Sequence, residues 1–223
     1  MVRIYNHLDL PEFEKAKQIS QDGTGKRLYQ TPQGNVYPSI TTVLNHLSEG
    51  VLERWRTRVG DKVADHESKW GRDRGTVIHA ALEKVLNNES LVGFPMISRM
   101  LVEDLKQYLL LIGDIHVQET PLYSDKFKIA GRCDTIGYYR GKLAVIDFKG
   151  SRKPKKMDWI EHYLLQVAFY AYAYWERTGI KIHHCVVLIA CETGHPQEII
   201  IEPWKYWKRL QEVREEYRRR ENI

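Results

Sequence analysis

Two aspartates stand at positions where neighbouring strands would bring them together. Residues 128–138 and 143–148 have the alternating composition of strands, and the turn sequence Tyr139-Arg140-Gly141-Lys142 separates them. If Arg140-Gly141 is a two-residue hairpin loop, Asp134 lies directly opposite Asp147, with Cβ atoms roughly 5 Å apart. A four-residue loop keeps this register, whereas a three-residue loop would place the two carboxylates on opposite faces of the sheet.

Two carboxylates at this distance suit a divalent cation. Unpaired, they would repel each other, and one would have to hold a proton. Oxygen ligands are what Mg²⁺ and Mn²⁺ prefer, and the backbone carbonyl of Phe148 could reach the same ion. The alternative is an ordinary ion pair between one aspartate and a base such as Arg132. The spacing alone leaves both interpretations open.

Lys149 favours the metal interpretation. It follows Asp147 by two residues, so both side chains point to one face of the strand, while Phe148 points into the core. A lysine there can orient a water molecule, or help to deprotonate it, for attack on phosphorus. Arg132 would oppose Lys149 in the same register, and two facing cations suit a phosphate better than they suit stability.

Two helical segments add polar groups at four-residue spacing. His79 and Glu83 share one helix face, and so do Gln166 and Tyr170. His79 could be a further metal ligand or contact a phosphate, and Glu83 could support a second ion. Taken singly, each is an ordinary helix residue, and a satisfied histidine or a core tyrosine is the commoner outcome.

Hydrophobic periodicity indicates the elements that must position these groups. Residues 1–37 look irregular, and Pro38–Thr42 opens a helix with Ser39 or Thr41 as its N-cap. Further helices are expected over residues 51–70, 75–86, 96–112, 157–178 and from 204 onward, and strands over 117–123, 128–138, 143–148, 185–190 and 198–201. This order of helices, βββαββ and a final helix predicts an α/β fold with a sheet covered by helices.

Composition excludes several classes of protein. The 223 residues are 43% hydrophobic and 28% charged, which allows a sizeable core and is unlike a disordered chain. Three cysteines without close ligand spacing argue against a disulfide framework, a zinc ribbon or a four-cysteine iron–sulfur site. We expect no transmembrane segment, signal peptide or transit peptide. The net charge of +5 fits either phosphate binding or a solvated basic surface.

Taken in chain order, the polar residues form a known pattern. Gly75-x-x-x-His79, Gly131-x-x-Asp134, Asp147-x-Lys149 and Gln166-x-x-x-Tyr170 resemble the RecB-type branch of the PD-(D/E)XK nuclease superfamily. Asp134 stands at the first acidic position, preceded by Cys133 where the pattern has proline. Further segments resemble the mitochondrial genome maintenance exonuclease group and its phage relatives: 37–41, 52–55, 141–149 and 151–155. The DxK motif alone is weak, but the ordered set on matching elements is specific.

The resemblance implies a restriction-endonuclease-like core, with a central mixed β-sheet flanked by helices. We expect residues 1–74 to form an N-terminal extension with a helical DNA-binding or lid region, and residues 75–223 to form the nuclease core, together as one compact unit. The implied activity is Mg²⁺- or Mn²⁺-dependent exonucleolytic hydrolysis of DNA, with preference for single strands or free ends. A structure-specific endonuclease and a catalytically silent DNA-binding module remain as alternatives.

The resemblance also assigns roles to residues. Asp134, Asp147 and the Phe148 carbonyl would hold the metal, with His79 and Glu83 as further candidates. Lys149 would position the water, while Gln166 and Tyr170 would brace the lysine and the DNA backbone. Candidate DNA contacts are Ser39, Thr41, Arg54, Arg58, Arg132, Ser151, Lys153 and Lys155. For the first two the alternative is helix capping, and for the basic residues a solvated face.

Further expectations concern cofactors, partners and location. We expect no iron–sulfur cluster, because the four cysteines that some RecB-type nucleases use are not present. A replication or recombination protein is a possible partner. A cytoplasmic location in a bacterial or phage-infected cell fits the N-terminal sequence, and no membrane association is expected.

Overall fold

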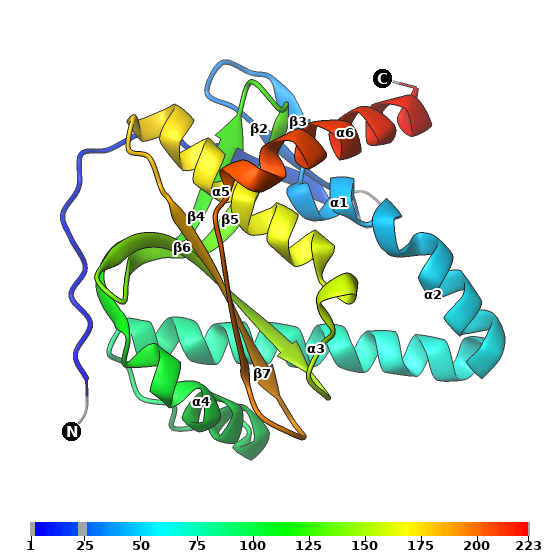
Figure 1. Ribbon diagram of the computed structural model, residues 1–223, viewed down its shortest axis with the longest axis horizontal. Helices are drawn as coiled ribbons and strands as arrows, with labels where there is room; N and C mark the ends of the chain where they lie inside the picture. The colour runs from blue at the N-terminus through cyan, green and yellow to red at the C-terminus, as the bar shows by residue number, and fades with distance from the viewer. Residues whose placement is uncertain (1–2, 22–25, 223) are drawn as a thin grey trace.

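The structure is a computed structural model that describes residues 3–21 and 26–222 (Figure 1). Its centre is a five-stranded sheet with the order β4-β5-β6-β7-β8. The strands are β4 (Ile112–Ser124), β5 (Ile129–Tyr139), β6 (Lys142–Ser151), β7 (His184–Cys191) and β8 (Gln197–Ile201). β6 and β7 are parallel and the other neighbours antiparallel. The expected mixed sheet is confirmed.

Helices cover both faces of the sheet because side chains alternate along each strand. On one face, Val145 belongs to a core shared with α1 (Ile40–Leu44), α5 (Glu161–Thr178) and α6 (Trp204–Glu221). On the other face, Ile146 and Phe148 share a core with α3 (Asp61–Leu86) and α4 (Met96–Leu109). Phe148 thus points into the core, as its place between Asp147 and Lys149 predicts.

The parallel pair depends on a crossover through α5. After β6 the chain passes a 3₁₀ helix, η1 (Met157–Trp159), and enters α5, which ends at Gly179 in the left-handed conformation with φ +74°. A helical crossover is what two consecutive parallel strands require. It places one end of α5 beside the strand that carries Asp147 and Lys149.

The N-terminal region differs from the expectation. Residues 1–37 were expected to be irregular, but β1 (Lys17–Gln21), β2 (Arg27–Gln30) and β3 (Val36–Pro38) form a three-stranded antiparallel sheet. The strands are too short for periodicity to reveal them. Tertiary packing holds them, because Tyr29 and Tyr37 are buried against residues of β4 and β5.

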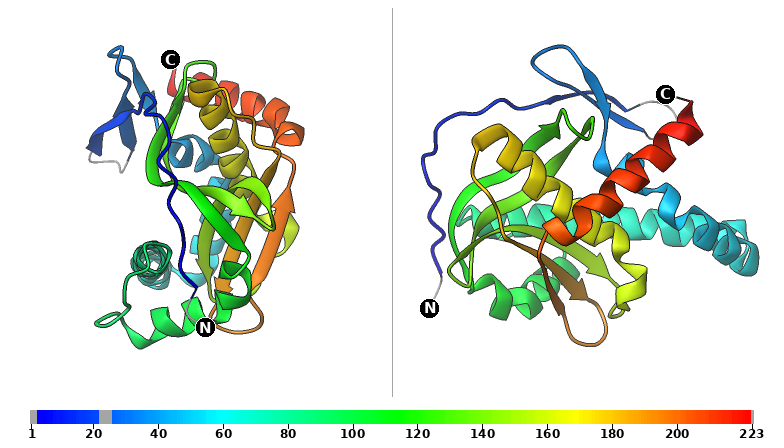
Figure 2. Two further views of the ribbon diagram at one scale, coloured as in Figure 1. Left: turned by 90° about the vertical axis from the view of Figure 1, so that its left-hand side faces the viewer. Right: turned by 45° about the horizontal axis from the view of Figure 1, so that its top comes forward.

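The helical region after α1 also differs. Helices expected over 51–70 and 75–86 are α2 (His46–Val59) and one continuous helix, α3, separated at Gly60 with φ +84°. Gly71 and Gly75, at the edges of the expected gap, lie inside α3, where each costs about 1 kcal/mol relative to alanine. The expected boundary between residues 74 and 75 therefore falls within a helix. Figures 1 and 2 show α2 and the first half of α3 as an arm that leaves the body.

Two smaller features complete the fold. The helix expected to reach residue 112 ends at Leu109, because β4 begins at Ile112. Across the described residues, no helix combines the length and the apolar composition that crossing a lipid bilayer requires.

Candidate functional site

A cavity of about 570 Å³ opens between α1, α3, α5 and the strands β4, β5 and β6. It collects residues that are far apart in the sequence. The predicted residues that line it are Ser39, Thr41, His79, Glu83, Arg132, Asp134, Lys149, Gln166 and Tyr170. Asp147 is fully buried, and its carboxylate is paired with the Lys149 ammonium that lines the cavity. The residues of the ordered sequence motif therefore lie together in one site.

The β5–β6 hairpin explains how the two aspartates meet. Arg140 and Gly141 both have positive φ, at +50° and +75°, as a two-residue turn of this hand requires. Pairing runs from Tyr139↔Lys142 to Thr135↔Ile146, in the predicted register. The next pair along would be Asp134 and Asp147. There the Phe148 amide donates a hydrogen bond to Asp134 Oδ2 at 2.9 Å instead of to a strand carbonyl.

The expected opposition of Arg132 and Lys149 is wrong. The β5–β6 ladder ends at Thr135↔Ile146, because the Asp134 side chain takes the Phe148 amide and β6 continues beside β7 alone. Arg132 forms an ion pair with Glu119 of β4 at 2.9 Å. Its side chain still lines the cavity.

Asp147 and Lys149 form a buried ion pair. Burial raises the pKa of Asp147 to about 6, with Lys149 opposing the rise and Asp134 adding to it. Burial alone would lower the pKa of Lys149, but the carboxylates of Asp147 and Asp134 outweigh it and raise that pKa. Asp147 Oδ1 accepts no hydrogen bond from the described residues. A buried acceptor left without a partner costs free energy unless something outside the chain binds it.

His79 and Asp134 belong to a second feature of the site, a group of three possible metal ligands. Nδ1 of His79 lies 3.3 Å from Oδ2 of Asp134, and together with Glu119 they bring ligand atoms that all lie within 4.8 Å of one another. An imidazole and two carboxylates within this range match the ligands of a divalent ion.

Glu119 was missed by the sequence analysis. Gln118 pairs with Thr135 and Thr120 with Cys133, so Glu119 stands across from Asp134, with an unusual φ of +46°. Burial raises its pKa to about 7, and Asp134 contributes to the rise. The sequence offers only one signal, an acidic residue in the strand before Asp134, because the β4–β5 connection does not fix the register.

Gln166 and Tyr170 form one wall of the cavity. Both are buried on α5, and Gln166 Nε2 donates to the Tyr170 hydroxyl at 3.4 Å. Gly131 makes this possible, because a Cβ at that position would lie 2.9 Å from the Tyr170 hydroxyl oxygen and 3.0 Å from Ile40 Cγ2. The glycine three residues before Asp134 is therefore needed for close packing.

The hydroxyl residues of α1 have the capping geometry that was the alternative interpretation. Ser39 is the N-cap of α1, and its Oγ accepts a hydrogen bond from the Thr42 amide at 3.0 Å. Ser39 Oγ also lies 2.9 Å from Thr41 Oγ1. Both residues still line the cavity, so capping positions the two hydroxyl groups there.

The other predicted DNA contacts lie outside the residues that line the cavity. Arg54 and Arg58 are exposed on α2, and Lys153 and Lys155 follow β6. The Ser151 hydroxyl is buried and donates to the Lys153 carbonyl at 2.7 Å. Further basic and aromatic residues line the cavity without having been predicted as contacts: Arg27, Tyr29, Arg72 and Tyr163. His162 also lines it, and by its spacing from Gln166 and Tyr170 it is a weaker candidate from the sequence.

His162 and Tyr163 stand next to Lys149. Their ring centroids are 4.2 Å apart, and the Lys149 ammonium lies 5.2 Å from the centroid of Tyr163. Burial, with the nearby Lys149 and Lys155, lowers the pKa of His162 to about 4. This imidazole is therefore neutral near pH 7.

Comparisons with known proteins give a family match and similar curated proteins. Residues 52–189 match the family described as the PD-(D/E)XK nuclease superfamily. Mitochondrial genome maintenance exonuclease 1 of Mus musculus is 27% identical over 226 residues, which cover 91% of this chain and 66% of the mouse protein. The Homo sapiens protein of that name is 25% identical over 214 residues, covering 86% and 62%. The match thus spans about two thirds of the length of these curated relatives. A crystal structure of a candidate exonuclease from Eubacterium rectale aligns with a TM-score of 0.41 and 13% identity, over 64% of this chain and 66% of that one.

Proposed function

The chain belongs to the PD-(D/E)XK nuclease superfamily, and from this membership we propose that it is a metal-dependent exonuclease that hydrolyses DNA from free ends. The observation that supports this most is the buried Asp147. Its carboxylate is paired with Lys149 on one side and leaves Oδ1 without a hydrogen-bond donor among the described residues. Stability alone does not explain such a group at the edge of a cavity.

The residues present fit a divalent cation. One imidazole and two carboxylates, from His79, Glu119 and Asp134, have ligand atoms that all lie within 4.8 Å of one another. The unpartnered oxygen of Asp147 adds a further acceptor. Hard oxygen ligands select Mg²⁺ or Mn²⁺ over softer metals. The proposed ligand set is Asp134, Asp147, the Phe148 carbonyl, His79 and Glu119, with Glu83 in support of a second ion.

Lys149 orients the attacking water. When bound, the cation polarises the phosphate and stabilises the charge that develops on its oxygens. The ion pair with Asp147 favours the ammonium form of Lys149, which can donate hydrogen bonds but cannot accept a proton. Orientation of the water, rather than its deprotonation, is therefore the role proposed for Lys149. Gln166 and Tyr170 form the buried wall that limits where the lysine and the DNA backbone can lie.

The cavity also supports a preference for single strands. His162 and Tyr163 line it beside Lys149, and a base can stack on such rings only when it is not paired within a duplex. Phosphates near the cleaved bond would be contacted by Ser39, Thr41 and Arg72, which line the cavity. The exposed Arg54 and Arg58 of the arm would contact the strand farther away, together with Lys153 and Lys155 beyond β6. Ser151 shapes the loop that carries those lysines.

The first experiment is a time course on end-labelled linear single-stranded DNA beside the same DNA circularised, each with Mg²⁺, Mn²⁺ or EDTA. We expect loss of the linear strand only with metal, and an intact circle. Cutting of the circle would replace the exonuclease with a structure-specific endonuclease on the same core. Binding of both DNAs without cutting in either metal would leave a DNA-binding module.

Metal binding can be measured without turnover. Titration of the metal-free protein with Mn²⁺ by calorimetry should give saturable binding, which Asp134→Asn weakens by about tenfold or more because a direct ligand is lost. Asp158→Asn, outside the proposed ligand set and exposed, is the matched control and should bind Mn²⁺ like the unaltered protein. Equal affinity in both variants would remove Asp134 from the ligand set.

A further inference from the structure

A second cavity, of about 110 Å³, lies between the turn that joins β4 to β5 and the helix α6. Figures 1 and 2 show the tip of this hairpin beside α6, on the side of the molecule away from α4. Lys126 and Lys128 of the turn line it, together with Arg214 and Arg218 of α6. Glu215 is the single acidic lining residue, and it lies 3.5 Å from Arg218. Positive charge therefore dominates the cavity.

Arg214 is the unusual member of this cluster. Its side chain is only 6% exposed, and Nε donates to the Phe127 carbonyl at 3.0 Å. Nη1 is buried and has no hydrogen-bond partner among the described residues. No carboxylate of the described part of the chain lies within ion-pair distance of this guanidinium.

Two partly buried arginines, each with a side chain that is 13% exposed, differ in this respect. Arg74 and Arg177 each leave their Nε without a partner, but Arg74 is paired with Glu192, and Arg177 with Asp125 and Glu176. Their charge is thus balanced within the protein. Burial lowers the pKa of Arg214 and the neighbouring Arg218 adds to this; Glu215 opposes the change without reversing it, so the charge is destabilised. A buried cation without a counter-ion is costly unless an anion from outside supplies the pairing.

We propose that this cavity binds a phosphate group, with the Arg214 guanidinium at its floor and Lys126 and Lys128 at its rim. Arginine donates from a planar fork that matches a tetrahedral oxyanion, and lysine adds point charges. Lys128 has a φ of +51°, so its backbone adopts the left-handed conformation within the turn. The volume admits an anion of this size in place of several water molecules.

The place of the cavity suggests where the phosphate comes from. Lys128 precedes β5 by one residue and Asp134 lies within that strand, so the two sites are roughly 20 Å apart along β5. Successive phosphates of one strand in B-form DNA are about 3.4 Å apart along the axis, so this separation spans several nucleotides. A strand held at Asp134 and Asp147 could place a backbone phosphate here. A free phosphate or nucleotide would satisfy the same chemistry.

The test uses inorganic phosphate with the metal-free protein, so it does not depend on hydrolysis. Melting temperatures are measured in EDTA with phosphate and with chloride at matched ionic strength. We expect phosphate to raise the melting temperature of the unaltered protein and of Arg219→Gln, an exposed α6 control that removes one positive charge. The rise should be lost in Lys126→Gln/Lys128→Asn, whose two positions are exposed, and in Arg214→Met. Equal rises in all four proteins, or none beyond the chloride effect, would overturn the proposal.

A second arm distinguishes the sources of the phosphate. Binding of a single-stranded oligonucleotide is measured in EDTA across a range of salt concentrations. If the backbone supplies the phosphate, the double lysine variant binds several-fold more weakly than Arg219→Gln, for all sequences, and the dependence of log K on log salt falls by about 0.7 for each lost contact. Unchanged DNA binding with a lost phosphate effect would assign the cavity to a free phosphate or nucleotide.

Discussion

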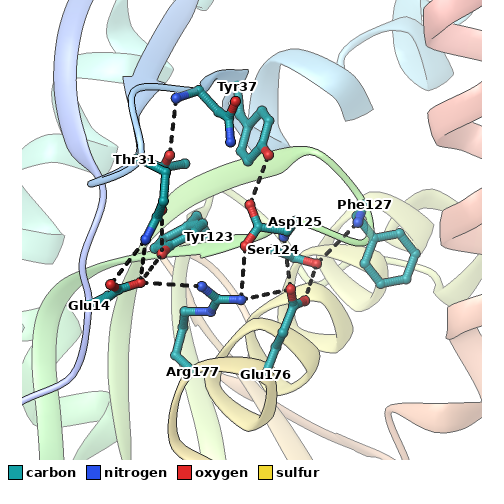
Figure 3. A network of polar contacts seen from close by, with 11 residues as sticks. Glu14, Thr31, Tyr37, Tyr123, Ser124, Asp125, Phe127, Glu176 and Arg177 are labelled. Carbon is teal, nitrogen blue, oxygen red and sulfur yellow. Dashed lines mark hydrogen bonds and ion pairs between the residues drawn. The ribbon is translucent and has the colours of Figure 1, made fainter.

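Two clusters of charged side chains include residues in or next to β4, and they differ in what sets the pKa values of their carboxylates. The first, here called the anchoring network, joins the N-terminal region to β4 and α5 (Figure 3). Tyr123 donates to Glu14 at 2.7 Å and Tyr37 donates to Asp125 at 2.8 Å. Arg177 pairs with Asp125 at 3.0 Å and with Glu176 at 2.8 Å. Every carboxylate of the network thus has a donor.

The second is the site cluster of His79, Glu119, Asp134, Asp147 and Lys149. Here two carboxylates have raised pKa values, mainly through burial, about 6 for Asp147 and about 7 for Glu119. In the anchoring network, hydrogen bonds from Tyr123 and Gln33 lower the pKa of Glu14. Donors from the chain also reach the site cluster, from Lys149 to Asp147 and from Arg132 to Glu119, but there burial outweighs them and keeps both pKa values raised. Substitutions in the site cluster should accordingly reduce activity, whereas substitutions in the anchoring network should reduce stability alone.

The largest effect on this comparison is expected from Lys149→Ala. Loss of the ammonium that orients the water should reduce the rate of DNA hydrolysis by about 100-fold or more. The free energy of unfolding should fall as well, by up to about 3–5 kcal/mol, because Asp147 stays buried without its cation, so the two rates are compared under conditions where both variants are folded. Single-turnover hydrolysis and urea unfolding measure the two quantities. Lys142→Ala, an exposed lysine at the start of β6, is the control, and equal rates in both variants would remove the proposed role.

Arg177→Met should lower the free energy of unfolding and leave the rate of DNA hydrolysis unchanged. The side chain is 13% exposed, and its guanidinium lies 4.3 Å from the ring centroid of Tyr123. It pairs with three carboxylates, those of Glu14, Asp125 and Glu176. Its loss should reduce the free energy of unfolding by roughly 2–3 kcal/mol, since acidic groups are left without their cation. Arg209→Met should cost about 1 kcal/mol or less, because this side chain is 34% exposed, although it pairs with Glu161, Glu212 and Glu216. Similar losses of the free energy of unfolding in both variants would mean that the anchoring network stabilises the fold no more than exposed ion pairs do.

Glu119→Gln tests the comparison through the pH dependence of the free energy of unfolding. In metal-free protein the folded state keeps the Glu119 proton between pH 4.5 and about 7, where the unfolded state has lost it. Stability should therefore fall as pH rises across this window, and Asp147 contributes in the same direction. Glu14 has a lowered pKa, so its contribution is lost only as pH falls below the ordinary value.

The measurement is urea unfolding in EDTA at pH values on either side of that window. Glu119→Gln should reduce the loss of stability at the higher pH and leave the loss in acid unchanged. Glu198→Gln, a carboxylate paired with Arg140 on the exposed edge of the sheet, is the control. If stability falls as steeply with pH in the Glu119→Gln variant as in the control, burial of this carboxylate is not the source of the slope.

The parts of the site that the sequence predicted depend on local rules. The Arg140-Gly141 turn fixes the β5–β6 register, and alternation then places Asp147 and Lys149 together. Glu119 was not predictable in this way, because its register depends on a longer connection and its left-handed φ results from tertiary packing. The N-terminal sheet was not predicted for a similar reason, since its strands are held by contacts with β4 and β5.

The arm shows the same limit for a helix. A gap was expected over residues 71–74, yet α3 continues through Gly71 and Gly75, and its face from Ile78 onward is buried in the core. Propensity is a weak rule when a long helix packs against a sheet. What the glycines cost the helix can still be measured.

Gly71→Ala should give the smallest effect, and one of opposite sign. A Cβ at Gly71 would meet no atom within 4 Å, and the residue lies outside both clusters. Alanine should raise the free energy of unfolding by up to about 1 kcal/mol, because glycine loses more backbone entropy when it is fixed in a helix. Gly131→Ala, where the Cβ would meet the Tyr170 hydroxyl at 2.9 Å, should instead lose stability. Urea unfolding of both variants measures this, and a destabilised Gly71→Ala protein would mean that the arm needs a flexible point inside α3.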